Sequence, residues 1–423
     1  MKNDNLKFKD IFWNTLGTVT YAAVSLLLSV VIIKFTGSIE GGIFSFGFST
    51  LAHIIYIISF FGMRAMHIVD VSYKYSFYEF RNFNFVCMIL AIFVGCIYIL
   101  VRYCMGVYTL VKSLLLFILV MHGAIDGFAD CYESEYQRVN KLYICGQNLF
   151  FRILLFTTSL LASLYLTNDL FKSEVIALIT ELIAFYVLNV LRSKDIFKTT
   201  NLGTENQYNY MFKEALPLFL INFLDMFLFS LSKFSIDANL GDVYSGYFNL
   251  IFMPTNVIYL VMNLFMKPLL TPLTNSYFNG KDEYYKLLKQ ILLLAFIISI
   301  TFIVGTIAFG QIYINVLNLV TNNIYEPIGS TIVYQNFKLE KILLLLVIIG
   351  GCSYTLSTPM YYAIIIENKQ KYLVIVYIVI LLISIYISNA FVVLYGIVGA
   401  GIGFSVSMFL LFIGIVIIRA LVR

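Results

Sequence analysis

Long apolar runs separated by short polar stretches dominate this chain of 423 residues. Most runs reach the roughly 20 residues that a helix needs to cross the hydrocarbon of a bilayer. The alternation that marks a transmembrane barrel is absent, so helices are the way to satisfy the backbone inside lipid. The pattern predicts twelve spans, near 11–33, 41–62, 84–102, 107–129, 147–167, 173–192, 214–236, 243–265, 290–315, 341–366, 371–391 and 396–418.

The composition excludes the other broad classes of protein. Hydrophobic residues make up 61% of the chain and charged residues 12%, whereas a soluble domain is roughly half apolar and a quarter charged. No soluble core buries so much apolar surface, which excludes a soluble enzyme, and the 39 Phe and 31 Tyr exclude disorder. The six cysteines form no CxxC pair, so we expect buried small hydrophobic residues and no disulfide framework or zinc site.

Lys and Arg are distributed unevenly between the two sides of the predicted helices. With the N-terminus inside, 20 of the 28 basic residues fall in inside segments, six fall outside, and Lys112 and Arg152 fall within spans. Cytoplasmic loops carry the excess of basic residues in membrane proteins. We therefore expect a multi-pass protein of a bacterial plasma membrane with both termini in the cytoplasm. The net charge of +5 is then a topology signal, and no nucleic-acid partner is expected.

A weak internal repeat divides the spans into two sets of six. A shift of 204 residues places Gly37 on Gly241 and Gly42-Ile43-Phe44 on Gly246-Tyr247-Phe248. Repeats that share one orientation relate by an axis along the membrane normal in several transporter folds. We expect an all-α protein with two six-helix bundles related by such a pseudo-two-fold axis, comprising an N-terminal bundle at 1–192, a cytoplasmic linker at 193–213 and a C-terminal bundle at 214–423.

Ionisable residues inside membrane spans are expensive and indicate function. His122, Asp126 and Asp130 recur every four residues and line one face of the fourth span, and Asp225 lies in the seventh. These four are candidates for proton or cation coupling, with Na⁺ or H⁺ as the coupling ion. A solvated helix end explains the first three equally well.

Basic residues and prolines give two further sets of candidates. Basic side chains in a cavity would hold an anionic group through charge-assisted hydrogen bonds, although snorkelling to the interface explains such residues as well. Prolines in membrane helices permit bending, and a purely architectural kink is the commoner reason for them. The anion candidates are Arg64, Lys112, Arg152 and Lys233, and the hinge candidates are Pro217, Pro254 and Pro359.

Catalytic motifs are missing from the sequence. It contains no GxSxG, no P-loop, no HExxH and three His in all. We therefore expect no enzyme activity, no metal and no cofactor other than a coupling ion.

Several short motifs resemble those of a known family. Trp13-Asn14-Thr15-Leu16-Gly17 opens the first span, Gly41-Gly42-Ile43-Phe44-Ser45 opens the second, and Gly62-Met63-Arg64 closes it. In the second half, Pro217-Leu218-Phe219-Leu220 is followed by Lys233-Phe234-Ser235-Ile236-Asp237. With twelve spans in a 6+6 arrangement, the chain resembles the Wzx-like polysaccharide flippases of the multidrug/oligosaccharidyl-lipid/polysaccharide exporter (MOP) superfamily. It departs from the family at Ala65-Met66, where relatives often have Tyr-Gln.

The resemblance implies a transported substrate and partners. Such relatives carry an undecaprenyl-pyrophosphate-linked oligosaccharide to the outer leaflet, for capsule or other surface polysaccharides, and work beside glycosyltransferases and a polymerase. Two alternatives remain. A cation-coupled multidrug or small-solute exporter of the same fold would use acidic residues such as Asp126, Glu181 and Asp225. A membrane polysaccharide polymerase or ligase would need a large outside loop, for which 318–340 is a poor candidate.

Overall fold

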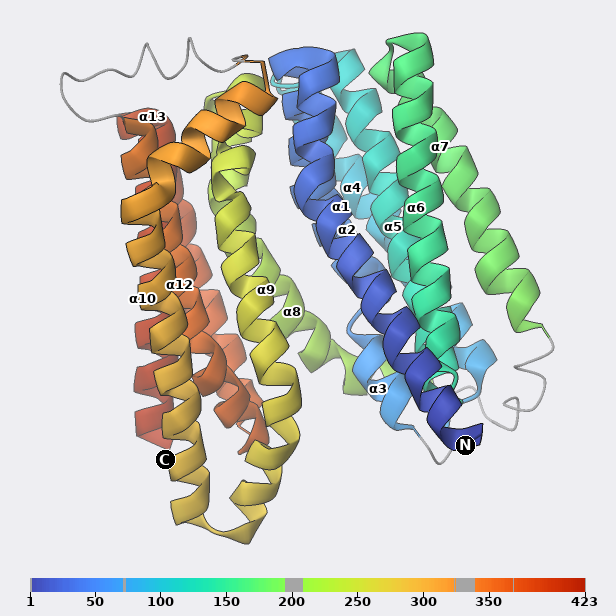
Figure 1. The fold of residues 1–423 in the computed structure, drawn as a ribbon, viewed down its shortest axis with the longest axis vertical. Coiled ribbons are helices and arrows are strands. Elements are labelled where there is room, and N and C mark those ends of the chain that lie inside the picture. Colours follow the sequence, from blue (N-terminus) through green and yellow to red (C-terminus); the bar gives the residue numbers. More distant parts are fainter. Residues whose placement is uncertain are drawn as a thin grey trace. The chain divides into compact units, whose positions relative to one another are not determined.

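A computed structural model describes residues 2–70, 74–194, 208–322, 324, 339–367 and 369–422 of the protein, and every regular element within these ranges is helical (Figure 1). Ten of the described helices are long and apolar enough to cross a membrane. The protein is therefore an all-α multi-pass membrane protein, as predicted. Its elements are α1 (Lys2–Phe46), the π-helix η1 (Gly47–Leu51), α2 (Ala52–Phe60), α3 (Met63–Val69), α4 (Phe77–Cys104), α5 (Leu110–Arg138), α6 (Leu142–Thr167), α7 (Leu170–Phe185), the π-helix η2 (Tyr186–Leu191), α8 (Tyr208–Asn239), α9 (Asp242–Asn279), α10 (Lys281–Val320), α12 (Leu339–Ile366) and α13 (Gln370–Val422).

Two of the ten apolar helices are double. The segments Lys9–Phe60 and Gln370–Leu421 each contain 52 residues, and a straight helix of that length would measure about 78 Å, more than twice the thickness of the hydrocarbon. The backbone is not helical at Gly37 (φ 85°, ψ −174°) or at Gly396 (φ 59°, ψ −138°). Each segment therefore supplies two crossings, and the described helices account for the twelve predicted spans.

The glycines at the first loop of each half share one backbone conformation. Gly37 has φ 85° and ψ −174°, and Gly241, between α8 and α9, has φ 89° and ψ −173°. Residues with a Cβ rarely adopt such angles, so both positions require glycine. The sequence shift of 204 had placed these two glycines on each other, and the backbone angles support that equivalence.

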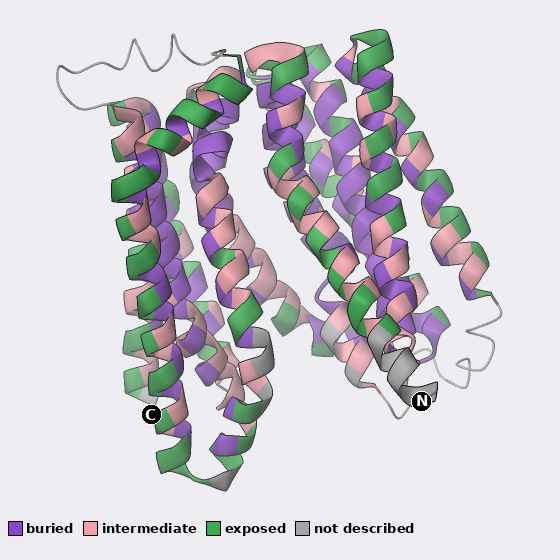
Figure 2. Cartoon of the chain, in the orientation of Figure 1, coloured by how far each residue is buried: buried purple, intermediate pink, exposed green. Residues whose placement is uncertain are grey.

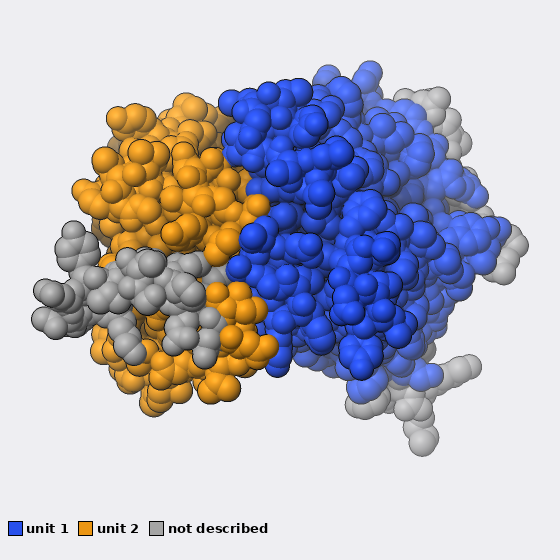
Figure 3. Space-filling model, turned by 90° about the horizontal axis from the view of Figure 1, so that it is seen from above, with its two compact units in different colours: residues 1–223 blue, residues 224–423 orange. Residues whose placement is uncertain are grey.

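The chain forms two compact units, residues 1–223 and 224–423, which Figure 3 colours separately. Their boundary lies inside α8, later than the start at 214 that we expected for the second bundle, because the beginning of α8 packs on the first unit. The rings of Phe61 and Phe219 stack with centroids 4.2 Å apart, and a Cβ at Gly62 would lie 2.8 Å from the backbone nitrogen of Phe219. Two of the family-like motifs thus contact each other. Most of the expected linker, 195–207, lies outside the described residues.

The fourth crossing of each unit is its most buried helix. In the most apolar stretch of α5, 83% of the residues are buried, and the value for α12 is 67%, against 28% for α4 and α10 (Figure 2). The outer helices face lipid with large exposed hydrophobic side chains such as Phe93 and Phe309. Polar groups on the inner face of α5 are consequently shielded from both water and lipid.

The helices α8, α9 and α12 continue through Pro217, Pro254 and Pro359. A proline cannot donate the helical hydrogen bond to the carbonyl four residues earlier, so Pro254 leaves the carbonyl oxygen of Leu250 without its donor. The hydroxyl group of Tyr313 on α10 donates to that oxygen at 2.7 Å. A neighbouring helix thus compensates the backbone at Pro254, and a hinge role for the three prolines stays a prediction.

Candidate functional site

Helix α5 carries a row of ionisable side chains through the interior of the first unit. It starts after Thr109, whose hydroxyl group accepts a hydrogen bond from the backbone nitrogen of Lys112 at 3.2 Å. His122, Asp126 and Asp130 are all buried, which places their shared face inside the bundle. We call these three residues, together with their partners Glu133, Arg64, Arg152 and Glu181, the buried ionic network.

Arg152 of α6 joins two carboxyl groups of α5. Its Nη2 lies 2.9 Å from Oδ1 of Asp126, and its Nη1 lies 2.8 Å from Oε1 of Glu133. Asp126 and Glu133 are seven residues apart, which is two helical turns on one face. One guanidinium group therefore neutralises much of the charge of two buried acids, and this use of Arg152 competes with the anion-binding role that we expected for it.

His122 pairs with an acid from a third helix. Its Nδ1 lies 2.7 Å from Oε2 of Glu181 on α7, and its Nε2 lies 4.0 Å from Oδ2 of Asp126. The imidazole ring stacks against Phe156 and Phe48, with centroid distances of 4.3 and 5.6 Å. The two phenyl rings that pack against the imidazole restrict its orientation, so a change in its protonation acts directly on Glu181 and Asp126.

Ligand atoms of His122, Asp126 and Glu181 lie within 4.8 Å of one another, which would suit a metal ion as well as protons. The 2.7 Å separation between Nδ1 of His122 and the carboxyl oxygen of Glu181 is a normal hydrogen-bond length. A metal held by both atoms would replace the proton of that bond. The geometry therefore favours a proton between these two groups.

Arg64 and Asp130 form the end of the network nearest α3. Arg64 follows the break between α2 and α3, where Phe61 and Gly62 both have positive φ. Its Nη1 donates to Oδ1 of Asp130, and the hydroxyl group of Ser134 donates to the backbone oxygen of Asp130 at 2.7 Å. The side chain of Arg64 is 36% exposed and that of Asp130 only 5%, so Arg64 is the member of the network within reach of solvent.

The buried ionic network contains more acidic than basic groups. Its four carboxyl groups, from Asp126, Asp130, Glu133 and Glu181, face the guanidinium groups of Arg64 and Arg152 and the imidazole of His122. With every carboxyl ionised and His122 neutral the net charge would be −2, and protonating His122 would still leave −1. An uncompensated charge in a dehydrated interior is costly. Neutrality of the network would therefore require two protons or cations, one of which His122 can hold.

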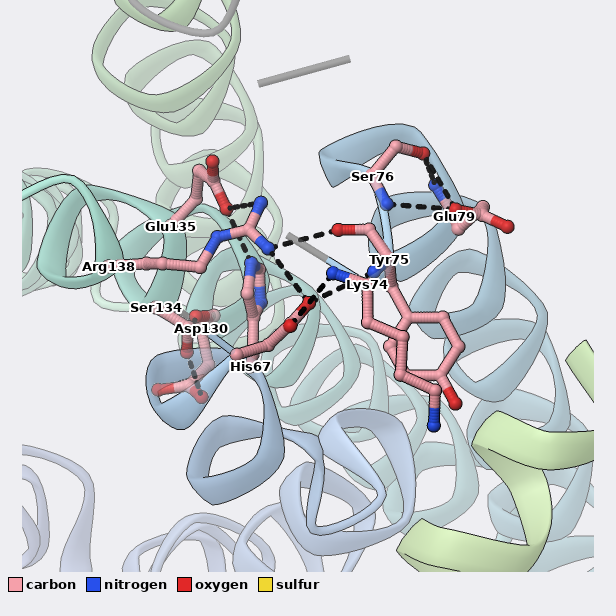
Figure 4. A network of polar contacts seen from close by, with 10 residues as sticks. His67, Lys74, Tyr75, Ser76, Glu79, Asp130, Ser134, Glu135 and Arg138 are labelled. Carbon is pink, nitrogen blue, oxygen red and sulfur yellow. Dashed lines mark hydrogen bonds and ion pairs between the residues drawn. The ribbon is translucent and has the colours of Figure 1, made fainter. Parts of the chain in front are cut away.

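A second polar cluster lies at the end of α5 and is shown in Figure 4. His67 of α3 is fully buried, and its Nε2 lies 2.6 Å from Oε2 of Glu135. Its ring stacks on Phe80 at 3.8 Å. Arg138 places Nη2 2.7 Å from the same carboxyl oxygen of Glu135 and donates through Nη1 to the backbone oxygen of Tyr75 at 3.0 Å.

The same cluster continues to the start of α8. The carboxylate of Asp70 accepts hydrogen bonds from the backbone nitrogens of Lys74 and Tyr75, at 2.9 and 3.0 Å. The ammonium group of Lys74 then lies 2.8 Å from Glu214. Ion pairs and hydrogen bonds thus connect four segments, namely α3, the segment before α4, the end of α5 and the beginning of α8.

Burial lowers the pKa of His67 below its ordinary value of 6.5, because desolvation of the charged ring outweighs the hydrogen bond and the electrostatic attraction to Glu135, which raise the pKa. The folded protein then favours neutral His67, whereas the unfolded chain takes up a proton near pH 6.5. The stability that this provides is present above pH 6.5 and is lost as the pH falls through the lower pKa of the folded state. We expect thermal stability in detergent to fall over that range.

The variant His67→Gln, which keeps a donor for Glu135 but does not titrate, should flatten this pH dependence. His53→Gln, at a histidine outside both clusters, serves as the control and should retain the wild-type slope. Equal slopes in the wild type and His67→Gln would contradict the assignment.

The other predicted site residues are not members of the buried ionic network. Lys112 is buried at the start of α5, with Nζ 4.1 Å from the ring centre of Tyr108. In the second unit, Lys233 is 5% exposed and lies over the ring of Phe252 at 4.4 Å. Asp225 accepts hydrogen bonds from Tyr354 and Tyr377, at 2.6 and 2.7 Å. Two neutral donors therefore hold Asp225, and the anion and coupling roles of these residues stay predictions.

Several residues of these clusters were not expected to have a site role, and Arg138 and His67 are examples. In the sequence analysis Arg138 is one of the 20 basic residues that indicate the topology, and His67 is not a candidate residue. The signal for Arg138 was its spacing, since it follows Glu135 by three residues on a helix that was already rich in acids. His67 offered no such signal, because its partner lies on a distant segment.

Comparisons with known proteins assign the fold. No family model matches the sequence, and no curated protein matches it. An inward-facing multidrug resistance MATE family transporter of the MOP superfamily matches with a TM-score of 0.63 at 13% identity, over 99% of this chain and 94% of that chain. The outward-facing conformation of a multidrug resistance MATE family transporter matches with a TM-score of 0.52 at 12% sequence identity, over 99% of this chain and 96% of that chain. The MATE transporter ClbM in complex with Rb⁺ matches with a TM-score of 0.51 at 16% sequence identity, over 99% of this chain and 94% of that chain. The chain therefore has a MATE-like fold.

Proposed function

We propose that this protein is a proton- or cation-coupled exporter that moves an undecaprenyl-pyrophosphate-linked oligosaccharide across a bacterial plasma membrane by alternating access. The observation that carries the coupling is the acid excess of the buried ionic network. Such a group of charges can exist in two states, one that holds the additional proton or cation and one that has released it. A transporter can use the difference between these states to draw on an ion gradient.

The substrate class rests on the sequence motifs and on the physics of the headgroup. A sugar chain with a pyrophosphate cannot enter hydrocarbon unaided, so it needs a polar path with cationic contacts. Arg64 is the best placed of the four cationic candidates, because its side chain is 36% exposed and it has one carboxyl partner. Arg152 is 4% exposed and is held by two acids, which makes it a structural cation in this proposal.

The coupling proposal predicts that His122→Ala combined with Asp126→Asn abolishes export without lowering the amount of protein in the membrane. The single change Glu181→Gln should reduce export while preserving the packing of α7. Glu283→Gln, at an exposed position at the start of α10, is the matched control and should behave as wild type. The measurement is surface glycan in a deletion strain of the source organism that carries each variant, with protein quantified in isolated membranes. Normal glycan display by the double variant would refute the coupling role.

A second candidate is export of multidrug-type solutes, because the matching structures include transporters described as multidrug resistance proteins. The same deletion strain separates the two functions. Loss of surface glycan with unchanged drug susceptibility supports the lipid-linked substrate. Increased drug susceptibility with intact glycan would replace it with a multidrug exporter.

A further inference from the structure

Glu174 of α7 is a buried acid with no partner among the described residues. Its residue is 1% exposed, and both carboxyl oxygens are buried without a hydrogen bond. The acids of the buried ionic network differ, since Asp126, Asp130, Glu133 and Glu181 each contact a base. A carboxylate without a cation or donor is far less stable in such surroundings than the neutral acid. The surroundings of Glu174 therefore favour the neutral, protonated acid.

Glu174 and Glu181 lie on one face of α7. The buried positions of this helix include Leu170, Glu174, Ala177, Glu181 and Ala184, which repeat every three or four residues. Two positions seven residues apart are separated by about 10 Å along a helix and point the same way. Ala177 lies between them and offers only a methyl group. The oxygen Oε1 of Glu181, on the carboxyl group that bonds His122, is also buried without a partner in the described structure.

Acidic residues connect Glu174 to the surface at the other end of α7. Glu40 of α1 is exposed and interacts electrostatically with both Glu174 and Asp169. Asp169 precedes α7, and its side chain is 35% exposed and pairs with the ammonium group of Lys172 at 3.0 Å. Surface carboxylates raise the local concentration of cations, protons included. A series of acids thus leads from the surface through Glu40 and Glu174 toward Glu181 and His122.

We propose that Glu174 is a proton-binding site that relays protons between the surface at Glu40 and the His122–Glu181 pair. The inference rests on the proposed function, since it assumes that this pair takes up protons. In each cycle the hydroxyl proton of Glu174 passes through water to Oε1 of Glu181, and the carboxylate left behind takes a proton from the surface. By the distribution of Lys and Arg, the surface at Glu40 faces the outside of the cell.

Dicyclohexylcarbodiimide tests the protonated state of Glu174 without any transport assay. A neutral carboxyl group gives its proton to a carbodiimide nitrogen while its oxygen adds to the central carbon, and the adduct rearranges to a stable acylurea. The full-length protein in detergent is treated across a pH series and its peptides are mapped by mass spectrometry. We expect modification of Glu174 at neutral pH that declines at alkaline pH, and no modification of exposed Glu40. Absence of labelling at Glu174, in protein whose denatured sample labels at acidic pH, would overturn the proposal.

Export by variants at Glu174 tests the relay itself. With external pH above neutral, Glu174→Gln should reduce surface glycan by about 100-fold or more, as for loss of a positioned proton-transfer group. External acid should reduce the defect, and Glu174→Asp should restore most of the export. If the loss of surface glycan in Glu174→Gln is the same at every external pH, the role of Glu174 is structural and the relay is refuted. If Glu174→Gln exports fully and the His122–Asp126 double variant does not export, only the relay is refuted. If both variants export fully, the proposed coupling is refuted as well.

Discussion

Replacing Arg152 by Met is expected to lower the free energy of unfolding by about 3–5 kcal/mol, the range for removing one partner of a buried ion pair. The guanidinium group contacts Asp126 at 2.9 Å and Glu133 at 2.8 Å. Met retains much of the side-chain volume but no charge, so two buried carboxyl groups lose their cation. Unfolding by SDS in mixed micelles measures the change.

Lys172→Met is the matched control, because Lys172 pairs with Asp169 at 3.0 Å on the surface and its side chain is 66% exposed. We expect this variant to lose less than about 1 kcal/mol. Adding Asp126→Asn and Glu133→Gln to Arg152→Met should recover part of the loss by removing the charges that Arg152 balanced. If Arg152→Met is no worse than the control, the network does not depend on this cation.

A second large effect is expected at the break in α13. A Cβ at Gly399 would overlap the backbone oxygen of Phe391, which lies on the other side of the break at Gly396. The atoms that the Cβ would overlap belong to the backbone of Phe391, so no flexible side chain can move aside to make room. Gly399→Ala should therefore destabilise the protein by about 1–3 kcal/mol or more, as overpacking does.

Gly305→Ala provides the comparison for Gly399→Ala. A Cβ at Gly305 meets nothing within 4 Å, and alanine in the interior of α10 should stabilise the helix by about 0.5–1 kcal/mol relative to glycine. The thermal unfolding midpoints of the two variants should thus move in opposite directions. A fall of similar size in both would mean that loss of glycine itself, and not the contact with Phe391, is responsible.

Much of the fold was predictable because lipid imposes a simple rule. An apolar run of about 20 residues has no stable alternative to a helix in hydrocarbon, so twelve runs gave twelve crossings. The repeat was predictable at Gly37 and Gly241 because a positive φ restricts the residue type. The end of the first unit was not, because the stacking of Phe219 on Phe61 joins segments that are distant in sequence.

The site was predictable only along a single helix. The four-residue spacing of His122, Asp126 and Asp130 placed them on one face of α5, and all three are buried. Their partners come from α3, α6 and α7, and a sequence does not show which faces of separate helices meet. For this reason Arg152 was considered as an anion ligand although two carboxyl groups hold it.

The glycine breaks also bear on how the chain enters a membrane. Gly37 and Gly396 join consecutive crossings through one non-helical residue, and two residues, Leu240 and Gly241, separate α8 from α9. Such pairs have almost no polar loop to carry through the hydrocarbon, which keeps the cost of translocation small. Each second helix can pack on the first as soon as it leaves the insertion machinery, so biogenesis would proceed in helical hairpins. A protease would find few extended peptide bonds to cleave at these three turns.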